Sequence, residues 1–312
     1  MEVRKRMNKA IEIVTLTKVE AANLNSNGTE GVISVLKKVR DPVDLKEYVR
    51  ISGQSVKFQL KQVIADMGLE EQISPVSRGE NGEKVNVSEG KPDKYIDDDL
   101  FGYMIAKGDK TRKRTAPVRT NGMISIFPYQ EDRDFGVRYD TSGKEQHNIF
   151  ETEISTNIMR GNFFIEVDRV GVFGKGEVDN ELTLPEDQRE GRIKVLLNAI
   201  ASYSGGAHLS RFLTKAYPEA MLVLALSRKI PVVGDNFRVK QEYVNGKYVL
   251  DVKLLKEVLR TFDEHINWVY LGLLKEKFAN LDEISALVSE NPKVKVFSMA
   301  ELKEELQKTS LL

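Results

Sequence analysis

Short runs of alternating apolar and polar residues recur along the chain and predict strands. Residues 11–17 are rich in β-branched side chains, and within 163–173 Ile165 and Val167 alternate with acidic residues. A period of two is typical of a strand with one buried face. The wholly apolar run at 220–226 predicts a buried central strand. Further strands are expected near residues 123–127, 150–158 and 294–297.

Other segments place apolar residues at helical spacing. The clearest is 54–67, where Val56 and Leu60 begin an apolar stripe that faces a core. Ser52 precedes this segment as a suitable N-cap, and residues 298–301 have the spacing of a capping box that opens a last helix. Helices are also expected at residues 189–203, 249–260 and 281–289.

Polar segments without periodicity separate these elements. Residues 23–31 are rich in Asn, Ser and Gly and predict a loop. Between residues 68 and 99, Gly, Asn, Glu, Ser and Pro dominate, which indicates an insertion or mobile loop. Gly161 and Asn162 suit a turn. The Gly pair at 205–206 either caps a helix or brings bare backbone against a polyanion.

Composition restricts the classes of function. The 312 residues, 41% of them hydrophobic, suffice for one elaborated domain or two. With 47 basic and 47 acidic side chains the net charge is zero, so any nucleic-acid surface must be local. The absence of cysteine excludes disulfides and thiolate metal sites and fits a cytoplasmic protein. We expect no signal peptide and no membrane span.

Two stretches suit contact with a polyanion. At the start of the helix predicted for 54–67, Gln54, Lys57 and Lys61 lie away from the apolar stripe. A helix N-terminus favours phosphate, although an ordinary capped surface helix would carry the same pattern. Residues 107–119 include six basic residues and a single acidic residue, an Asp. This charge predicts a hairpin that reaches out to phosphates, or else a solvated face.

Three adjacent carboxylates, Asp97, Asp98 and Asp99, invite comparison with a metal-dependent endoribonuclease. Neighbouring residues of a strand or helix point in different directions, so these side chains are expected to form a solvated acidic turn. The histidines, His147, His208 and His265, lack metal-binding spacing. We therefore predict no catalytic residue, no metal and no cofactor.

Four motifs, in this order, resemble the DevR branch of the CRISPR-associated backbone subunits, the seventh Cas protein of type I Cascade complexes. The resemblance covers about residues 10–240, and its motifs are Asn23–Gly31, Ile51–Phe58, Asp99–Met104 and Lys113–Thr120. It implies an α+β fold with a modified RRM, or ferredoxin-like, palm of βαββαβ order. Residues 1–67 and 146–312 would form the palm with C-terminal helical additions, and 68–145 the inserted fingers and thumb.

The resemblance also implies a function. Such a subunit binds CRISPR RNA without cutting it, stacks head to tail with further copies of itself, joins other Cascade subunits and presents the guide to target DNA. The alternatives are an endoribonuclease using Asp97–Asp99 and a regulatory protein without RNA. The residues that match RNA-binding positions of the family are Asn25, Ser26, Ser52, Gln54, Ser55, Lys57, Lys61, Arg112, Arg114, Arg119, Gly205, Gly206 and Arg211.

Overall fold

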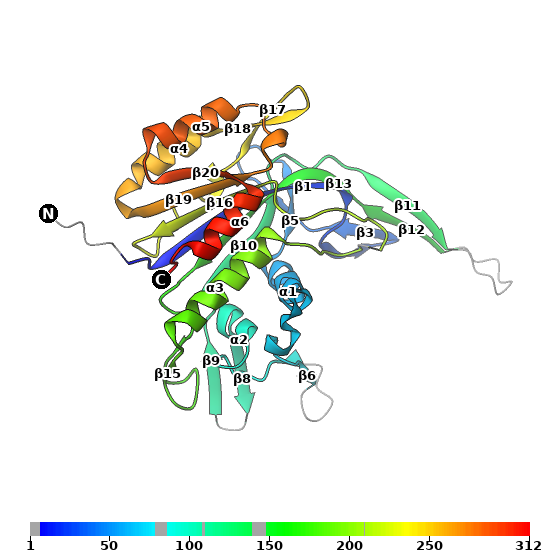
Figure 1. The fold of residues 1–312 in the computed structure, drawn as a ribbon. Helices are drawn as coiled ribbons and strands as arrows, with labels where there is room; N and C mark the ends of the chain where they lie inside the picture. Colours follow the sequence, from blue (N-terminus) through cyan, green and yellow to red (C-terminus); the bar gives the residue numbers. More distant parts are fainter. Residues whose placement is uncertain (1–6, 79–85, 108–109, 139–147, 209) are drawn as a thin grey trace.

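A central sheet organises the computed structural model, which describes residues 7–78, 86–107, 110–138, 148–208 and 210–312. Within these ranges the sheet has eight strands (Figure 1). Neighbouring strands are antiparallel except β19 and β20, which pair in parallel at one edge. In spatial order they are β20 (Val294–Ser298), β19 (Ile266–Leu273), β16 (Ala220–Leu226), β1 (Ala10–Ala22), β13 (Ser155–Ile165), β10 (Val118–Ser125), β5 (Glu47–Ile51) and β4 (Lys38–Arg40).

The middle of this sheet is buried on both faces. Along β1, Ile11 and Ile13 point into one hydrophobic core, whereas Val14 and Leu16 point into a second core on the opposite face. The wholly apolar strand β16 alternates in the same way, which confirms the prediction from its sequence. Side chains of successive strand residues point to opposite faces, so a strand needs an unbroken apolar run only where both faces are covered.

Helices cover the two faces. The helices α1, α3 and α6 pack in the first core through residues such as Leu60, Leu196 and Leu302. The helices α4 and α5 pack in the second core through Leu255 and Leu287, and Figure 1 shows them on the far side of the sheet from α3 and α6. The helices are α1 (Gly53–Ile64), α2 (Ile96–Phe101), α3 (Glu186–Ala201), α4 (Val252–Thr261), α5 (Leu281–Glu290) and α6 (Met299–Lys308).

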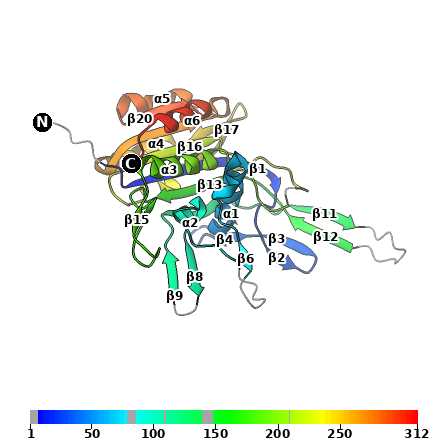
Figure 2. The same ribbon diagram turned by 60° about the horizontal axis from the view of Figure 1, so that its bottom comes forward.

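Two structures extend from the sheet (Figure 2). We call β11, β12, β3 and β2 the arm, and β8 with β9 the basic hairpin. The arm strands are β11 (Arg133–Arg138), β12 (Asn148–Glu153), β3 (Ile33–Leu36) and β2 (Ser26–Glu30). The basic hairpin pairs β8 (Tyr103–Lys107) with β9 (Lys110–Arg114). The remaining pairs are β14 (Val172–Phe173) with β15 (Leu182–Thr183), β17 (Val239–Val244) with β18 (Lys247–Leu250), and β6 (Ser77–Arg78) with β7 (Asn86–Val87).

The long apolar and amphipathic segments fold as their patterns predict, giving a mixed α+β protein. The expected capping box is present at Ser298, whose Oγ accepts from the amide of Glu301 at 3.2 Å. Within the range 68–145, expected to be one insertion, the chain returns to the central sheet as β10. No helix in the described ranges is long and apolar enough to cross a membrane.

The turn expected at Gly161 and Asn162 was wrong, and the strand expected at 163–173 is only partly present. Gly161 and Asn162 lie inside β13, opposite Thr15 and Val14 of β1, and the strand ends at Ile165. A Cβ at Gly161 would lie 2.7 Å from the Thr15 hydroxyl oxygen, so the glycine serves close packing between strands. A turn-forming residue pair can therefore have a different use inside a sheet.

The first core depends on the apolar stripe of α1. We expect Leu60→Ala to lower the free energy of unfolding by about 2–5 kcal/mol, because a fully buried side chain leaves a cavity. Phe58→Ala, on the same helix, should change it by no more than about 0.5 kcal/mol, since Phe58 is 58% exposed. Urea denaturation measures both effects, and equal losses would contradict this orientation of the helix.

Candidate nucleic-acid interface

The first turn of α1 is held against a neighbouring loop. The Ser52 hydroxyl accepts a hydrogen bond from the amide of Ser55 at 3.3 Å and so caps the helix, as its sequence predicts. The amide of Ser52 donates to Oδ1 of Asn25 at 2.8 Å. Asn25 and Ser52, both of which match RNA-binding positions in the family resemblance, therefore lie side by side. Their hydrogen bond fixes the loop relative to the helix.

A second loop closes on the same helix. A Cβ at Gly205 would lie 2.0 Å from the Gln59 side chain, and one at Gly206 would lie 2.5 Å from Leu24. Both glycines have positive φ, 115° and 143°, and the amide of Ala207 donates to the carbonyl of Leu24 at 3.0 Å. We call residues 23–26, 52–61 and 204–207 together the cradle. The close contacts of Gly205 with Gln59 and of Gly206 with Leu24 were not predicted from the sequence.

Lys57 is the exceptional charge of the cradle. Burial, followed by the neighbouring charge of Lys61, lowers the pKa of Lys57 below its ordinary value. The positive charge of Lys61 is paired with a carboxylate, because its Nζ lies 2.7 Å from Oδ2 of Asp97. Within the described ranges Lys57 forms no ion pair with a carboxylate. A half-buried, uncompensated ammonium group is costly unless a ligand supplies negative charge.

Several of the other polar side chains of the cradle are engaged within the protein. The Ser26 hydroxyl bonds the carbonyls of Gly28 and Val35 and lies 3.1 Å from the Ser34 hydroxyl. Gln54, by contrast, is exposed at the start of α1. Lys57, Gln54 and the capped first turn are therefore the groups of the cradle best placed to meet a ligand.

The three aspartates form a buried helical turn, so the expected solvated acidic turn was wrong. They occupy α2 and are each 1% exposed or less. Asp97 bonds Lys61 and the amide of Ser74, whereas Asp98 accepts from the amide of Lys91 at 3.0 Å. The side chains diverge, and no group of three potential ligands for a metal is found among the described residues.

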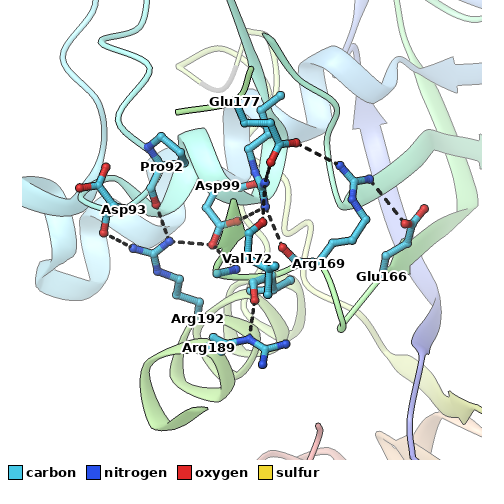
Figure 3. A network of polar contacts seen from close by, with 12 residues as sticks. Pro92, Asp93, Asp99, Glu166, Arg169, Val172, Glu177, Arg189 and Arg192 are labelled. Carbon is cyan, nitrogen blue, oxygen red and sulfur yellow. Dashed lines mark hydrogen bonds and ion pairs between the residues drawn. The ribbon is translucent and has the colours of Figure 1, made fainter. Parts of the chain in front are cut away.

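Asp99 is the centre of an ion-pair network (Figure 3). Its two oxygens lie 2.6 Å from Nη2 of Arg114 and 2.6 Å from Nη1 of Arg192. Oδ2 also accepts from the amide of Gly171, and Arg114 reaches Glu177 at 2.7 Å. Asp99 and Arg114 both have fully buried side chains. The network joins α2, α3, the loop before β14 and the base of the basic hairpin.

This network corrects one residue of the predicted interface. The Arg114 guanidinium has no exposed surface, so we assign Arg114 a structural role and remove it from the RNA-binding set. Arg112, two residues before Arg114 in β9, is partly exposed and pairs with Asp179 at 3.2 Å. Arg119 is half exposed and pairs with Glu166. Both lie outside the cradle.

Arg211 also lies outside the cradle, where it contacts the arm. Its Nη1 donates to the Thr152 hydroxyl at 2.9 Å, and its Nη2 donates to Asp134. The guanidinium packs over the rings of Phe150 and Phe212. Of the three histidines considered as metal ligands, His147 lies outside the described residues.

Asp99 provides a test of the structural role of the acidic helix. Asp99→Ala is expected to lower the free energy of unfolding by about 3–5 kcal/mol, because it leaves two guanidinium groups without their shared carboxylate. Asp93→Ala is the control, since Arg192 bonds the backbone oxygen of Asp93, which this substitution leaves in place. A folded Asp99→Ala protein that had lost cleavage of labelled RNA in Mg²⁺ would instead support an endoribonuclease.

Lys57 gives a pH-dependent test. Its folded-state pKa lies below 10.5, so the unfolded chain binds this proton more tightly. The wild type should therefore gain stability as pH rises through the folded pKa towards 10.5. Lys57→Met should remove that gain and be at least as stable as the wild type at about pH 7. Urea denaturation at about pH 7 and about pH 9.5 measures both; a large loss with Lys57→Met would show that the ammonium group is paired.

Two solved structures have similar folds. One, "CRISPR RNA-guided surveillance complex", matches with a TM-score of 0.58 and 13% identity, over 90% of this chain and 100% of that chain. The other, "CRISPR RNA-guided surveillance complex, pre-nicking", matches with a TM-score of 0.60 and 11% identity, over 96% of this chain and 99% of that chain. At these identities the likeness establishes the fold. A search of curated proteins finds no match.

The family assignment rests on a separate comparison. A family model described as "CRISPR-associated negative auto-regulator DevR/Csa2" matches residues 13–248. This range includes the cradle, the arm and the basic hairpin, and it confirms the resemblance seen in the sequence motifs. Since the match spans most of the chain, the protein belongs to the DevR/Csa2 family of CRISPR-associated proteins.

Proposed function

We propose that this protein is a non-catalytic backbone subunit that binds CRISPR RNA in a type I surveillance complex. The observation that carries the proposal is Lys57, a half-buried cation without a carboxylate partner in the described ranges. It lies in the first turns of a capped helix, between two loops whose backbone approaches closely. A phosphodiester would supply the missing charge, and a helix N-terminus favours the same group.

The strand order supports an RRM-like palm. β16, β1, β13 and β10 lie in that order, with α1 between β1 and β10 in sequence and α3 between β13 and β16. This connectivity is βαββαβ, and both helices pack in the first core. The palm would comprise residues 1–67 and 146–312 together with β10. The rest of 68–145 would supply the fingers, including the basic hairpin, and the strand β11. Although β12 lies within 146–312, it pairs with β11, and we equate these two strands with the thumb.

The mode of binding follows from the groups in the cradle. Ammonium, hydroxyl and backbone amide groups recognise a phosphate and sugar chain, which is the same for every sequence. The bases would remain available for pairing with target DNA, so the guide and not the protein would determine specificity. Zero net charge over the whole chain suits close stacking of copies along one RNA.

The arm is the element suited to contact a neighbouring copy. It projects from the body, and Phe135 and Ile149 are 59% and 50% exposed on it. Other subunits of the complex would meet the ends of the stack. A non-catalytic role is supported by the internal engagement of Asp97–Asp99, whose carboxylates neutralise or bond protein groups.

RNA binding is the direct test. Purified protein should carry RNA, seen as a raised ratio of absorbance at 260 to 280 nm. On single-stranded RNA, log Kd against log salt should give a slope magnitude of roughly 2–3 per bound copy. Lys57→Glu should weaken binding by roughly tenfold or more while leaving the fold intact.

Lys253→Glu supplies the matched control, because it makes the same charge change at an exposed position of α4. Equal losses for the two variants would show that only net charge matters and would remove the cradle as the site. A nucleic-acid-free protein with nearly flat salt dependence would favour a regulatory protein without RNA.

A further inference from the structure

Arg211, which follows the 204–207 loop of the cradle, contacts the arm. Arg211 follows Gly205 and Gly206 by a few residues, and its amide donates to the carbonyl of His208 in a tight turn. From this turn the guanidinium donates to Thr152 at 2.9 Å and to Asp134. The sequence assigned Arg211 to RNA, but these bonds direct it to β11 and β12.

The arm is shaped to receive this side chain. Asp134 pairs with Thr152 across the strands, and Gly136 pairs with Phe150, so all four lie on one face. A Cβ at Gly136 would lie 2.3 Å from the Phe150 ring and 3.0 Å from Nη2 of Arg211. The glycine therefore makes room for the ring and the guanidinium, which stacks 4.4 Å from the ring centroid.

Only an arginine fits all of these contacts at once. A planar guanidinium can donate to two acceptors in its plane while its face lies against an aromatic ring, whereas a lysine ammonium group cannot. The side chain is 28% exposed, and its charge is already paired with Asp134. These features indicate a fixed structural contact in place of a surface cation that awaits a phosphate.

We propose that Arg211 is a positioning residue that fixes the direction of the arm relative to the cradle. The loop that lies against Gln59 and Leu24 also carries Arg211, so cradle and arm are held in one geometry. The opposite face of the arm, with Phe135 and Ile149, is thereby aimed at the next copy along the RNA. This role rests on the proposed function, but the geometry itself can be measured without RNA.

The direction of the arm can be measured by spin labels. The chain has no cysteine, so Gln62→Cys on α1 and Phe135→Cys on the arm accept one label each. Double electron–electron resonance should give a narrow distance distribution in the otherwise unchanged protein. Arg211→Ala, Arg211→Lys and Gly136→Ala should each broaden it, and a distribution that stays narrow in all three would overturn the proposal. Gly136→Ala and Asp134→Asn test the same contact from the arm side, even where an Arg211 variant fails to fold.

Two RNAs then separate positioning from direct contact. On an oligonucleotide of about five nucleotides, close to the smallest single-strand sites, the label-free Arg211 variants should bind within about twofold of wild type. On RNA of about 40 nucleotides, which holds several such sites, both should assemble at least about tenfold less well. Arg260→Ala, which removes an exposed arginine of α4, should match wild type on both RNAs.

Direct phosphate contact predicts a different pattern. Arg211→Ala would then lose affinity for the short RNA and lower the salt slope by about one, and Arg211→Lys would restore both. That result would overturn the positioning role. If the wild type bound neither RNA, the proposed function would be wrong, and the label distances would still decide whether Arg211 holds the arm.

Discussion

Burial of the central sheet on both faces is the constraint on which the rest of this structure depends. Since β1 and β16 send alternate side chains into two cores, the middle of the sheet is fully used for packing. Groups that meet a ligand must then lie at strand ends and on elements that leave the sheet. The cradle consists of the start of a helix and two loops beside the sheet, and the arm and the basic hairpin extend away from it (Figure 2).

Many charged side chains are likewise used for contacts within the protein. The chain has as many acidic as basic side chains, and many of the arginines and lysines lie against carboxylates. At Asp99 this compensation is complete enough to bury two charged side chains with no exposed surface. Buried pairs of this kind are costly to break and weak as net stabilisers. Against such compensation, Lys57 stands out as a half-buried cation with no carboxylate partner among the described residues, which is why the proposed RNA contact rests on it.

Sequence patterns predicted those features that depend on neighbours within a few positions. The apolar stripe of α1, the apolar run of β16 and the capping box at Ser298 were all read correctly, because each is a local consequence of helix or strand geometry. The burial of Asp99 was missed, since its partner Arg192 lies 93 positions away. The prediction for Arg114 failed for a different reason, because a basic run in the sequence shows charge density and not depth within the fold.

The C-terminal part of the chain has a consequence for what counts as a unit of folding. The family match ends at residue 248, yet β19 pairs with the buried strand β16, and α6 seats Leu302 against Gly272 in the first core. The helices α4 and α5 cover the second core. A fragment cut at the family boundary would leave apolar surface of β16 in water and an open strand edge beside it. The segment that the family model matches is therefore shorter than the segment that packs together around the central sheet.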